Sequence, residues 1–325
     1  MTTLWDTTGT EVVKALGEAR RTAGAMVSGL ALTLVVVADE KKVAEAEVAA
    51  VRAASAHPCR VLIVVRRQID SEQPRLDAEI SVGGRLGPGE AVVMRMYGRL
   101  ALHAESVVLP LLAPDVPVLT WWHGDAPKKI AHDPLGVFAD RRVTDAAQAP
   151  DPIAALRIRA TDFAPGDTDL AWTRTTPWRS VLAGAYDNIA VRTVAARIGA
   201  EAGNPSAWLI AGWLKGRLGV EAELVTTSGP GITEVYLRLE DDSELSINRP
   251  DGHSAVLHRT GVQDRRLPLH RRDIGDQLAE ELRRLDPDQP YARALSAATG
   301  ITELENRPAG RQHEWMEPAL ANGAS

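Results

Sequence analysis

The first quarter of the chain carries two short, uninterrupted hydrophobic runs, at residues 30–37 and 61–65. Both runs are rich in β-branched residues and too short for most helices, so we expect strands that are buried on both faces of a sheet. Between them, Ala44, Val48 and Val51 recur at helical spacing. A strand, a helix and a second strand within about forty residues predict a βαβ unit whose two strands run parallel.

The rest of the first half continues this alternation. Thr8 and Glu11 have the spacing of a capping box, which predicts a helix within residues 1–24. Further strands are expected at 76–86, 91–97, 116–122 and 141–144, and further helices near 100–109 and 134–139. The pattern predicts a Rossmann-like α/β domain, with a mostly parallel sheet and helices on its faces.

The hydrophobic period changes in the second half. Residues 145–170 are rich in Ala, Asp and Pro, so we expect a domain boundary there. Asn204 and Pro205 have the residue types of a helix N-cap and first helical position, where free amides could also hold a phosphate, although an ordinary cap is favoured. Apolar and polar residues alternate from 221 to 260, which predicts an antiparallel meander with one solvated face. A helix near residues 273–285 is expected to cover that meander.

These elements divide the 325 residues into two domains and a tail. We predict an α/β domain at residues 1–163 and an α+β domain with an antiparallel sheet at 164–302. Residues 303–325 are polar, rich in small residues and expected to be disordered. The chain as a whole is 45% hydrophobic and 25% charged, as globular proteins are, so wholesale disorder is excluded.

Charge and cysteine content narrow the function classes. The net charge is −6 and neither half is basic, which argues against a nucleic-acid partner. The single cysteine, Cys59, excludes an intrachain disulfide. The acidic N-terminal residues do not have the pattern of a signal peptide, and no apolar run approaches the roughly 20 residues of a membrane span. We therefore expect a cytoplasmic protein with no membrane contact.

Sequence patterns for catalysis and for cofactor binding are weak. The glycine-rich loop at residues 83–89 lacks a following Lys and Ser or Thr and lies between two expected strands, so a structural turn is favoured over an anion site. His253 and His258 have no evident third ligand for a metal ion. Cys59 lies two residues after His57, and a packed thiol is favoured over a catalytic nucleophile. We expect no catalytic residue, no cofactor and no metal ion.

The first of two tryptophan clusters ends an expected strand. Trp121 and Trp122 lie where the carboxyl edge of a parallel sheet receives ligands and partners. Because adjacent residues on a strand point to opposite faces, at most one of the two can face a given side. The alternative is that both rings pack under the flanking helices.

The second cluster follows the expected domain boundary. Trp172, Arg174, Trp178 and Arg179 lie within eight residues, and a proline at the first helical position would hold the last two on a rigid turn. Trp and Arg are the residue types most enriched in interface hot spots. As interface anchors, the two tryptophans could be replaced by Ala with a loss of binding and without unfolding. The alternative is that they pack the two domains together.

Four pieces of the sequence, taken in order, carry a family resemblance. They are His57-Pro58-Cys59-Arg60-Val61, Pro117-Val118-Leu119-Thr120-Trp121-Trp122, Trp172-Thr173-Arg174 followed by Pro177-Trp178-Arg179, and residues 203–213. In these pieces the chain resembles the OpcA family, the glucose-6-phosphate dehydrogenase assembly proteins of actinobacteria and cyanobacteria. Two features depart from the family pattern. Thr175 stands where relatives often carry Leu, and one cysteine cannot form the dithiol switch described for cyanobacterial members, which leaves only a mixed or intermolecular disulfide.

The resemblance implies a non-catalytic assembly factor and allosteric activator. Such a protein binds glucose-6-phosphate dehydrogenase, promotes its active oligomeric form, and controls flux into the oxidative pentose phosphate pathway of carbohydrate metabolism. The partner-binding residues that we predict are Trp172, Arg174, Trp178 and Arg179, followed by Trp121 or Trp122. The alternative, drawn from the residues alone, is an enzyme or sensor that binds a nucleotide or a sugar phosphate in the α/β domain.

Overall fold

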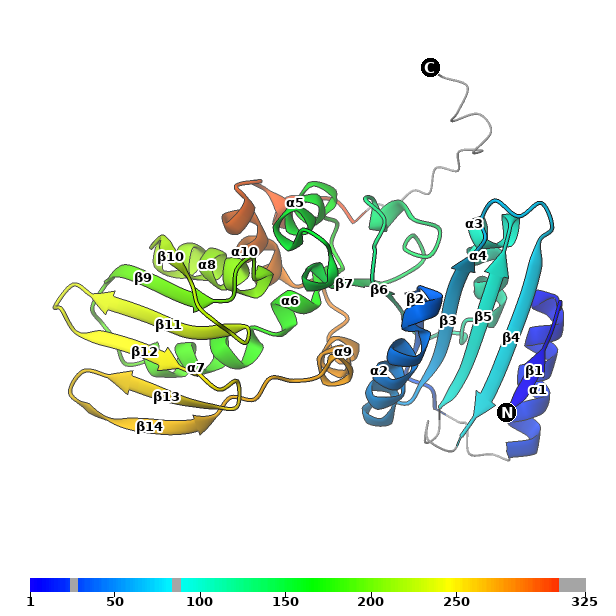
Figure 1. Ribbon diagram of the computed structural model, residues 1–325, viewed down its shortest axis with the longest axis horizontal. Helices are drawn as coiled ribbons and strands as arrows, with labels where there is room; N and C mark the ends of the chain where they lie inside the picture. Colours follow the sequence, from blue (N-terminus) through cyan, green and yellow to red (C-terminus); the bar gives the residue numbers. More distant parts are fainter. Residues whose placement is uncertain (24–28, 84–88, 310–325) are drawn as a thin grey trace, which may run out of the picture.

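Two β-sheets lie at opposite ends of an elongated molecule (Figure 1). The computed structural model describes residues 1–23, 29–83 and 89–309. Within these residues the first sheet has eight strands in the order β1-β4-β5-β3-β2-β6-β7-β8, and the second has six in the order β10-β9-β11-β12-β13-β14. The predicted fold class is confirmed, because a mostly parallel sheet with flanking helices is followed by a mostly antiparallel one.

The first sheet is parallel except at one edge. Its strands are β1 Thr2–Leu4, β2 Leu32–Ala38, β3 Cys59–Arg67, β4 Arg75–Val82, β5 Glu90–Tyr97, β6 Val118–His123, β7 Arg141–Thr144 and β8 Asp167–Asp169. Within it only β4 is reversed, and it pairs antiparallel with β1 and with β5. The strands β2 and β3 pair in parallel and are joined by α2 (Val43–Ala56), so the predicted βαβ unit is confirmed.

Helices cover both faces of the first sheet. One face carries α1 Gly9–Ala23, α3 Arg99–Leu102, α4 Ala104–Val108 and the short 3-10 helix η3 Leu109–Leu111, and the other carries α2 and α9 Ile274–Leu282. Side chains of β2 alternate between these two cores, with Leu34 and Val36 facing α2 and Val35 facing α1. The strand is therefore buried on both faces, as its continuous hydrophobic run predicts.

The predicted capping box is present at the start of α1. Thr8 Oγ1 accepts a hydrogen bond from the Glu11 backbone N–H at 3.3 Å, and Glu11 Oε2 accepts one from the Thr8 N–H at 3.3 Å. The strand β1 precedes this helix and pairs with β4. The sequence does not predict β1, because three residues carry too little periodicity.

The helix expected at residues 134–139 is absent. Residues 134–138 form turns that follow the 3-10 helix η4 (Ile130–His132). The reason lies at Gly136, where a Cβ atom would stand 1.8 Å from the carbonyl oxygen of Ile130. The chain therefore doubles back on itself too tightly for a helix.

The stretch where we expect the domain boundary, residues 145–170, is structured throughout. It holds the 3-10 helix η5 (Ala146–Gln148), the helix α5 (Pro152–Asp162) and the strand β8. Asp151 caps α5, since its side chain accepts hydrogen bonds from two backbone N–H groups of the first turn. The first sheet extends past residue 163, because β8 pairs with β7.

The second sheet begins with a parallel pair. Its elements are β9 Thr193–Ala200, β10 Ala222–Thr226, β11 Ile232–Leu239, β12 Glu244–Asn248, β13 Ser254–Arg259 and β14 Val262–Pro268, with α7 Thr176–Tyr186 and α8 Pro205–Leu218 on one face. The predicted meander is confirmed from β11 to β13 and is wrong for β10, which runs parallel to β9, while β14 extends the meander beyond the predicted range. The helix α8 makes this crossover, and Asn204 caps it by accepting a hydrogen bond from the Ala207 N–H at 3.0 Å.

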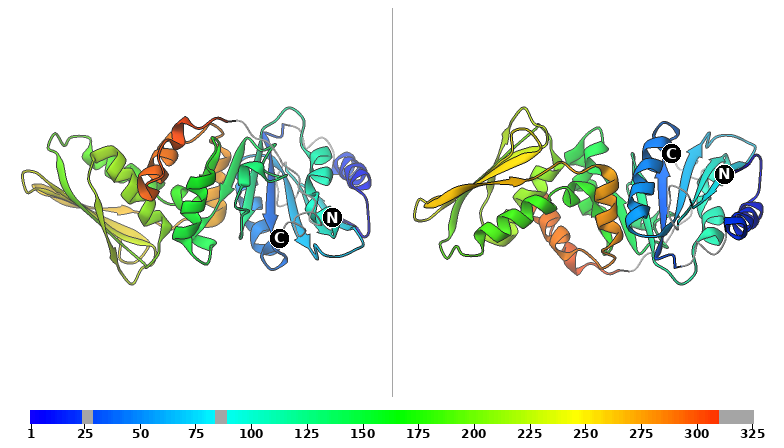
Figure 2. Two further views of the ribbon diagram at one scale, coloured as in Figure 1. Left: turned by 90° about the horizontal axis from the view of Figure 1, so that it is seen from above. Right: turned by 90° about the horizontal axis from the view of Figure 1, so that it is seen from below.

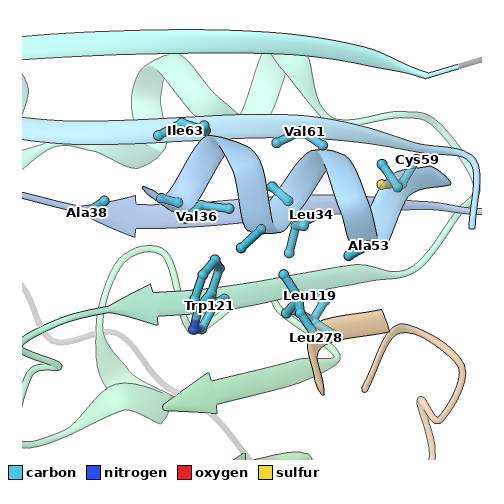
Figure 3. Close-up of a cluster of buried hydrophobic side chains, with 14 of the residues drawn as sticks. Leu34, Val36, Ala38, Ala53, Cys59, Val61, Ile63, Leu119, Trp121 and Leu278 are labelled. Atoms are coloured by element: carbon cyan, nitrogen blue, oxygen red, sulfur yellow. The ribbon is translucent and has the colours of Figure 1, made fainter. Parts of the chain in front are cut away.

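The helix that we expect over the meander covers the first sheet instead. Leu278 and Leu282 of α9 are buried in the core beneath α2, and Leu278 lies beside Leu119 of β6 (Figure 3). The close crossing requires a glycine, because a Cβ atom at Gly275 would lie 2.9 Å from the Cβ of Arg52. The apolar stripe predicts the helix correctly, but helical periodicity does not say which sheet the stripe meets.

A layer of helices fills the space between the two sheets (Figure 2). It contains α5, α6 Leu170–Thr173, α8 and α10 Gln289–Thr299, whose buried side chains form one core. Leu304 joins this core within the 3-10 helix η6 (Leu304–Asn306), so the tail predicted from residue 303 is wrong at its start. Residues 310–325 lie outside the described residues.

The packing of α8 on α10 generates a stability prediction. A Cβ atom at Gly212 would stand 2.1 Å from the carbonyl oxygen of Ala294, so Gly212→Ala should force the two helices apart and lower the free energy of unfolding by about 1–3 kcal/mol. Gly216→Ala, on the exposed side of α8 with nothing within 4 Å, should raise it by up to about 1 kcal/mol. Urea unfolding measures both. A Gly212→Ala protein as stable as the Gly216→Ala protein would contradict the contact.

Candidate functional site

A pocket of about 640 Å³ lies at the junction of the two sheets. One wall comes from α2 and residues 145–148, and the other from the first turns of α7 and α8, the turn before β11 and residues 270–277. We call it the junction pocket. Segments that are far apart in the chain form its walls, so no single local sequence motif marks the whole pocket.

One end of the junction pocket adjoins the carboxyl ends of the parallel strands. After β2 the chain builds β3 and β5 on one side and then returns to place β6 on the other, which makes β2 and β6 the topological switch point where open α/β sheets receive ligands. Here Gln148 accepts a hydrogen bond from Lys42 Nζ at 2.9 Å, and its Nε2 lies 3.3 Å from His123 Nδ1. The turn after β2 reads Asp39-Glu40-Lys41-Lys42, and without glycine it does not provide the cradle that a dinucleotide pyrophosphate needs.

Buried carboxylates stand next to this point. The side chain of Asp145 is fully buried and receives two hydrogen bonds of 2.6 Å from Arg174. Asp169 accepts hydrogen bonds from Thr144 Oγ1 and from the Ala146 N–H. Burial and the nearby charge of Asp145 raise the pKa of Asp169 to about 6. Arg174 is therefore engaged within the chain, and about a quarter (26%) of its side chain remains exposed.

A second buried ion pair ties the first sheet to α9. Arg141 of β7 donates to Glu281 of α9 through Nε at 2.8 Å and Nη2 at 2.5 Å. Thr173, which ends α6, donates its hydroxyl to the other oxygen of the same carboxylate at 2.6 Å. Both charged side chains are at most 4% exposed. One carboxylate thus connects the first sheet, the middle helical layer and the segment that returns from the second sheet.

The structure places Trp121 and Trp122 inside the first sheet's helical cover, at 0% and 1% exposure. Trp121 lies in the core under α2 (Figure 3), whereas the ring of Trp122 lies near Gly136 on the other side of the strand. The prediction that only one of the two faces a given side is confirmed. Neither ring reaches the surface, so the alternative in which both pack under flanking segments fits the structure.

Trp172 and Trp178 are also interior, at 1% and 2% exposure. Trp172 packs in the middle helical layer, where its Nε1 donates to Asp288 Oδ2 at 2.9 Å and its ring centroid lies 6.0 Å from that of Tyr291. Trp178 belongs to the core of the second sheet. Replacing either ring by Ala removes interior packing, so the structure favours a loss of stability over the sequence-based expectation that the fold tolerates this change.

The two arginines of the same cluster are partly exposed. Arg179 lies over Trp172, with its Cζ 3.6 Å from the ring centroid, and burial lowers the pKa of Arg179 to about 10. Thr175 connects them, because its hydroxyl donates to the Trp172 carbonyl at 2.6 Å and accepts from Arg179 Nε at 2.8 Å. A Leu at this position would lose both bonds. No observation here tests the partner-binding role of the six predicted residues, and it stays a prediction.

Cys59, His57 and His258 are the other residues whose side chains could take part in chemistry. Cys59 is fully buried in the core beneath α2 (Figure 3), and burial raises the pKa of its thiol to about 12. Burial also lowers the pKa of His57. His258 is paired with Asp264, at 2.7 Å from Nδ1 to Oδ1. Across residues 1–23, 29–83 and 89–309, no three His, Cys, Asp or Glu side chains are grouped so as to hold a metal ion.

Sequence reasoning misses most of the junction pocket. Arg249 and Arg271 enter it from the second sheet, and Gln148 and Gln277 from the first sheet's side and from α9. No spacing rule connects these positions. Two local signals do fall in the pocket wall: the cap at Asn204, which places the first turn of α8 there, and the second tryptophan cluster, which contributes Arg174 and Trp178.

The chain matches two family models that together cover most of its length. Residues 50–161 match the model described as the glucose-6-phosphate dehydrogenase subunit N-terminal domain, and residues 165–295 match the one described as the C-terminal domain of the same subunit. The fold and these matches define a class of two-part proteins, in which each half has its own β-sheet and matches its own family model. The chain belongs to the OpcA family of glucose-6-phosphate dehydrogenase assembly proteins, and the resemblance in its sequence motifs is confirmed.

Other comparisons add little. No curated protein matches the chain. Among solved structures, a dehydrogenase from Chromobacterium violaceum matches with a TM-score of 0.40 and 10% identity, over 83% of this chain and 94% of that chain. A likeness this distant says nothing about activity. In the described part of the chain no helix combines the length and the apolar character that crossing a bilayer requires.

The burial of Cys59 generates a reactivity prediction. Because the thiolate is the reactive form, a thiol with a pKa of about 12 and no exposed surface should not react with iodoacetamide at pH 8 in the folded protein. The same chain in guanidinium chloride should take up one label, which mass spectrometry counts. Rapid labelling of the folded protein would contradict the burial and reopen a mixed disulfide at this position.

The interior position of Trp172 generates a second prediction. Trp172→Ala should lower the free energy of unfolding by about 3–5 kcal/mol, because it leaves a cavity in the helical layer. Trp172→Phe keeps a ring but loses the bond to Asp288, and its loss should be smaller. Denaturant titration compares the two. An Ala variant as stable as the wild-type protein would contradict the interior packing of this ring.

Proposed function

We propose that the chain is a non-catalytic assembly factor that binds glucose-6-phosphate dehydrogenase in the cytoplasm and promotes its active oligomeric form. The observation that supports this proposal is the match of both halves to family models described as subunit domains of that dehydrogenase. Through this binding the chain controls how much glucose 6-phosphate passes into the oxidative pentose phosphate pathway.

The proposed activation works by differential affinity. A partner that binds two states of an enzyme equally well shifts nothing, however tightly it binds. A typical coupling free energy of about 1–3 kcal/mol changes an affinity by roughly 5–150-fold. The chain therefore activates the dehydrogenase only to the extent that it prefers the active oligomer over the inactive one.

For the contact surface we propose the partly exposed arginines near the junction of the two sheets. In this proposal Trp172 acts from the interior, because it supports the guanidinium of Arg179 from below at 3.6 Å. Trp178, Trp121 and Trp122 keep the surrounding backbone in place. Arg174 is held in one orientation by its two bonds to Asp145, which suits a preorganised contact.

Mixing the purified chain with the dehydrogenase of the same organism tests the proposal. Size-exclusion chromatography with light scattering should show a complex, and the KM for glucose 6-phosphate or the kcat should change by about fivefold or more. Absence of a complex, or a complex with unchanged kinetics, would contradict it. Turnover of a metabolite by the isolated chain would contradict its non-catalytic part.

A matched pair of variants tests the contact surface. Arg179→Met removes a charge that has no carboxylate ion pair in the described chain, so the fold should persist while dehydrogenase affinity falls about tenfold or more. Trp5→Ala removes an indole ring that is 66% exposed, next to the outer edge strand β1, and should leave the affinity unchanged. Melting temperatures control for folding. If Trp5→Ala weakened binding and Arg179→Met did not, the proposed contact surface at the junction would be contradicted.

A further inference from the structure

The wall of the junction pocket that belongs to the second sheet holds a buried guanidinium group that forms no ion pair with the described residues. Arg249 follows β12 and is only 5% exposed. Its two terminal nitrogens donate to the carbonyl oxygens of Leu269, at 3.0 Å, and Ile232, at 2.8 Å, and its guanidinium lies 4.9 Å from the ring of Trp178. Its Nε, also buried, has no hydrogen-bond partner in the described chain. A buried cation in this position needs an anion.

A second guanidinium stands next to the first. A Cβ atom built on Gly231 would lie 3.7 Å from Nη2 of Arg249 and 4.0 Å from Nε of Arg271, so the two side chains flank the same glycine. Burial, and then the like charge of Arg271, lower the pKa of Arg249 to about 10. Neither arginine forms an ion pair with any carboxylate of the described residues. Two like charges are therefore held together at one end of a pocket.

The carboxylates of the pocket do not neutralise this pair. They are Glu45, Asp145, Glu201 and Asp273. Asp145 is taken by Arg174, and Asp273 lies 2.7 Å from Arg52. The other two carboxylates do not come within ion-pair distance of either pocket-end arginine in the described part of the chain. Asp251, outside the pocket lining, acts on Arg249 through its charge, but it accepts its hydrogen bonds from the backbone N–H groups of His253 and Ser254. Among the lining residues, the wall around Gly231 therefore carries a surplus of positive charge.

Two further features of the pocket wall suit a specific ligand. The first turn of α8, a helix of 14 residues, lines the pocket with Pro205 and Ser206 and brings its positive dipole end toward it. Gln277 is 3% exposed and donates its Nε2 hydrogen to the Arg272 carbonyl at 2.7 Å, which leaves its Oε1 buried without a donor in the described chain. A hydroxyl group is the natural donor to such an oxygen.

We propose that the junction pocket binds a small organic phosphate that carries hydroxyl groups. Its phosphate oxygens accept hydrogen bonds from Arg249 Nε and from the guanidinium of Arg271, near the first turn of α8. Its hydroxyl groups donate to Gln277 Oε1. The volume of about 640 Å³ falls within the range of roughly 300–1,000 Å³ found for small-molecule sites. This site belongs to the chain alone and does not rest on the proposed binding of the dehydrogenase.

Calorimetry on the full chain with three probes tests the proposal. The probes are ribose 5-phosphate, which carries the phosphate and hydroxyl groups common to sugar phosphates and nucleotides, and inorganic phosphate and ribose, which separate the two parts. Ribose 5-phosphate should bind one to one and more tightly than inorganic phosphate, and ribose alone should not bind. If neither phosphate compound binds below about 10 mM, the site is refuted. If the two bind equally, the hydroxyl contact is refuted.

Variants decide which residues hold the ligand. Arg271→Gln, at an exposed position, should weaken ribose 5-phosphate binding about tenfold or more. Arg238→Gln removes an arginine of β11 that is 46% exposed and paired with Asp242, and should leave the affinity unchanged. Arg249→Met should abolish binding if it folds, and Arg271→Gln decides the matter if it does not. Equal weakening by Arg238→Gln, or full affinity of Arg271→Gln, would overturn the site.

Discussion

The structure depends on one buried carboxylate, that of Glu281. It receives two hydrogen bonds from Arg141 of the first sheet and one from Thr173 of the middle helical layer. Removing one partner of a buried ion pair typically costs about 3–5 kcal/mol, because the other charge is left without compensation. The pair therefore fixes where α9 meets the first sheet, and α9 in turn fixes the outer wall of the junction pocket.

This constraint explains why the tryptophans of the conspicuous sequence cluster lie inside. The segment from 172 to 179 begins in the helical layer and ends on the second sheet, so its large rings fill the two cores on either side. Its arginines are partly exposed: Arg179 lies over the ring of Trp172, and Arg174 is held by Asp145. A cluster of Trp and Arg can mark a partner interface or the packing between two halves of one chain. The sequence pattern is the same in both cases, and only the burial of the rings distinguishes them.

The local parts of the fold could be predicted from the sequence, and their mutual placement could not. The βαβ unit, the capping box at Thr8 and the cap at Asn204 each follow from a few neighbouring residues, and each is present. The partner sheet of α9 depends on Gly275 meeting Arg52, more than two hundred residues away. The junction pocket is missed for the same reason, since Arg249 and Gln277 meet only after both sheets have formed. The strand β10 is expected in the meander but runs parallel to β9, because the local pattern of apolar and polar residues does not encode the direction of a strand.

The route of the chain through α9 has a consequence for how the protein folds and can be divided. Leu278 and Leu282 complete the hydrophobic core of a sheet whose strands all end by residue 169. A fragment that stops there would expose the alanine-rich underside of α2 to water. A newly synthesised chain would expose the same surface until α9, in the last fifth of the sequence, had been made. The core of the amino-terminal half is thus completed by a helix from the far end of the chain. Because the two halves share this core, they should unfold together in a single cooperative transition.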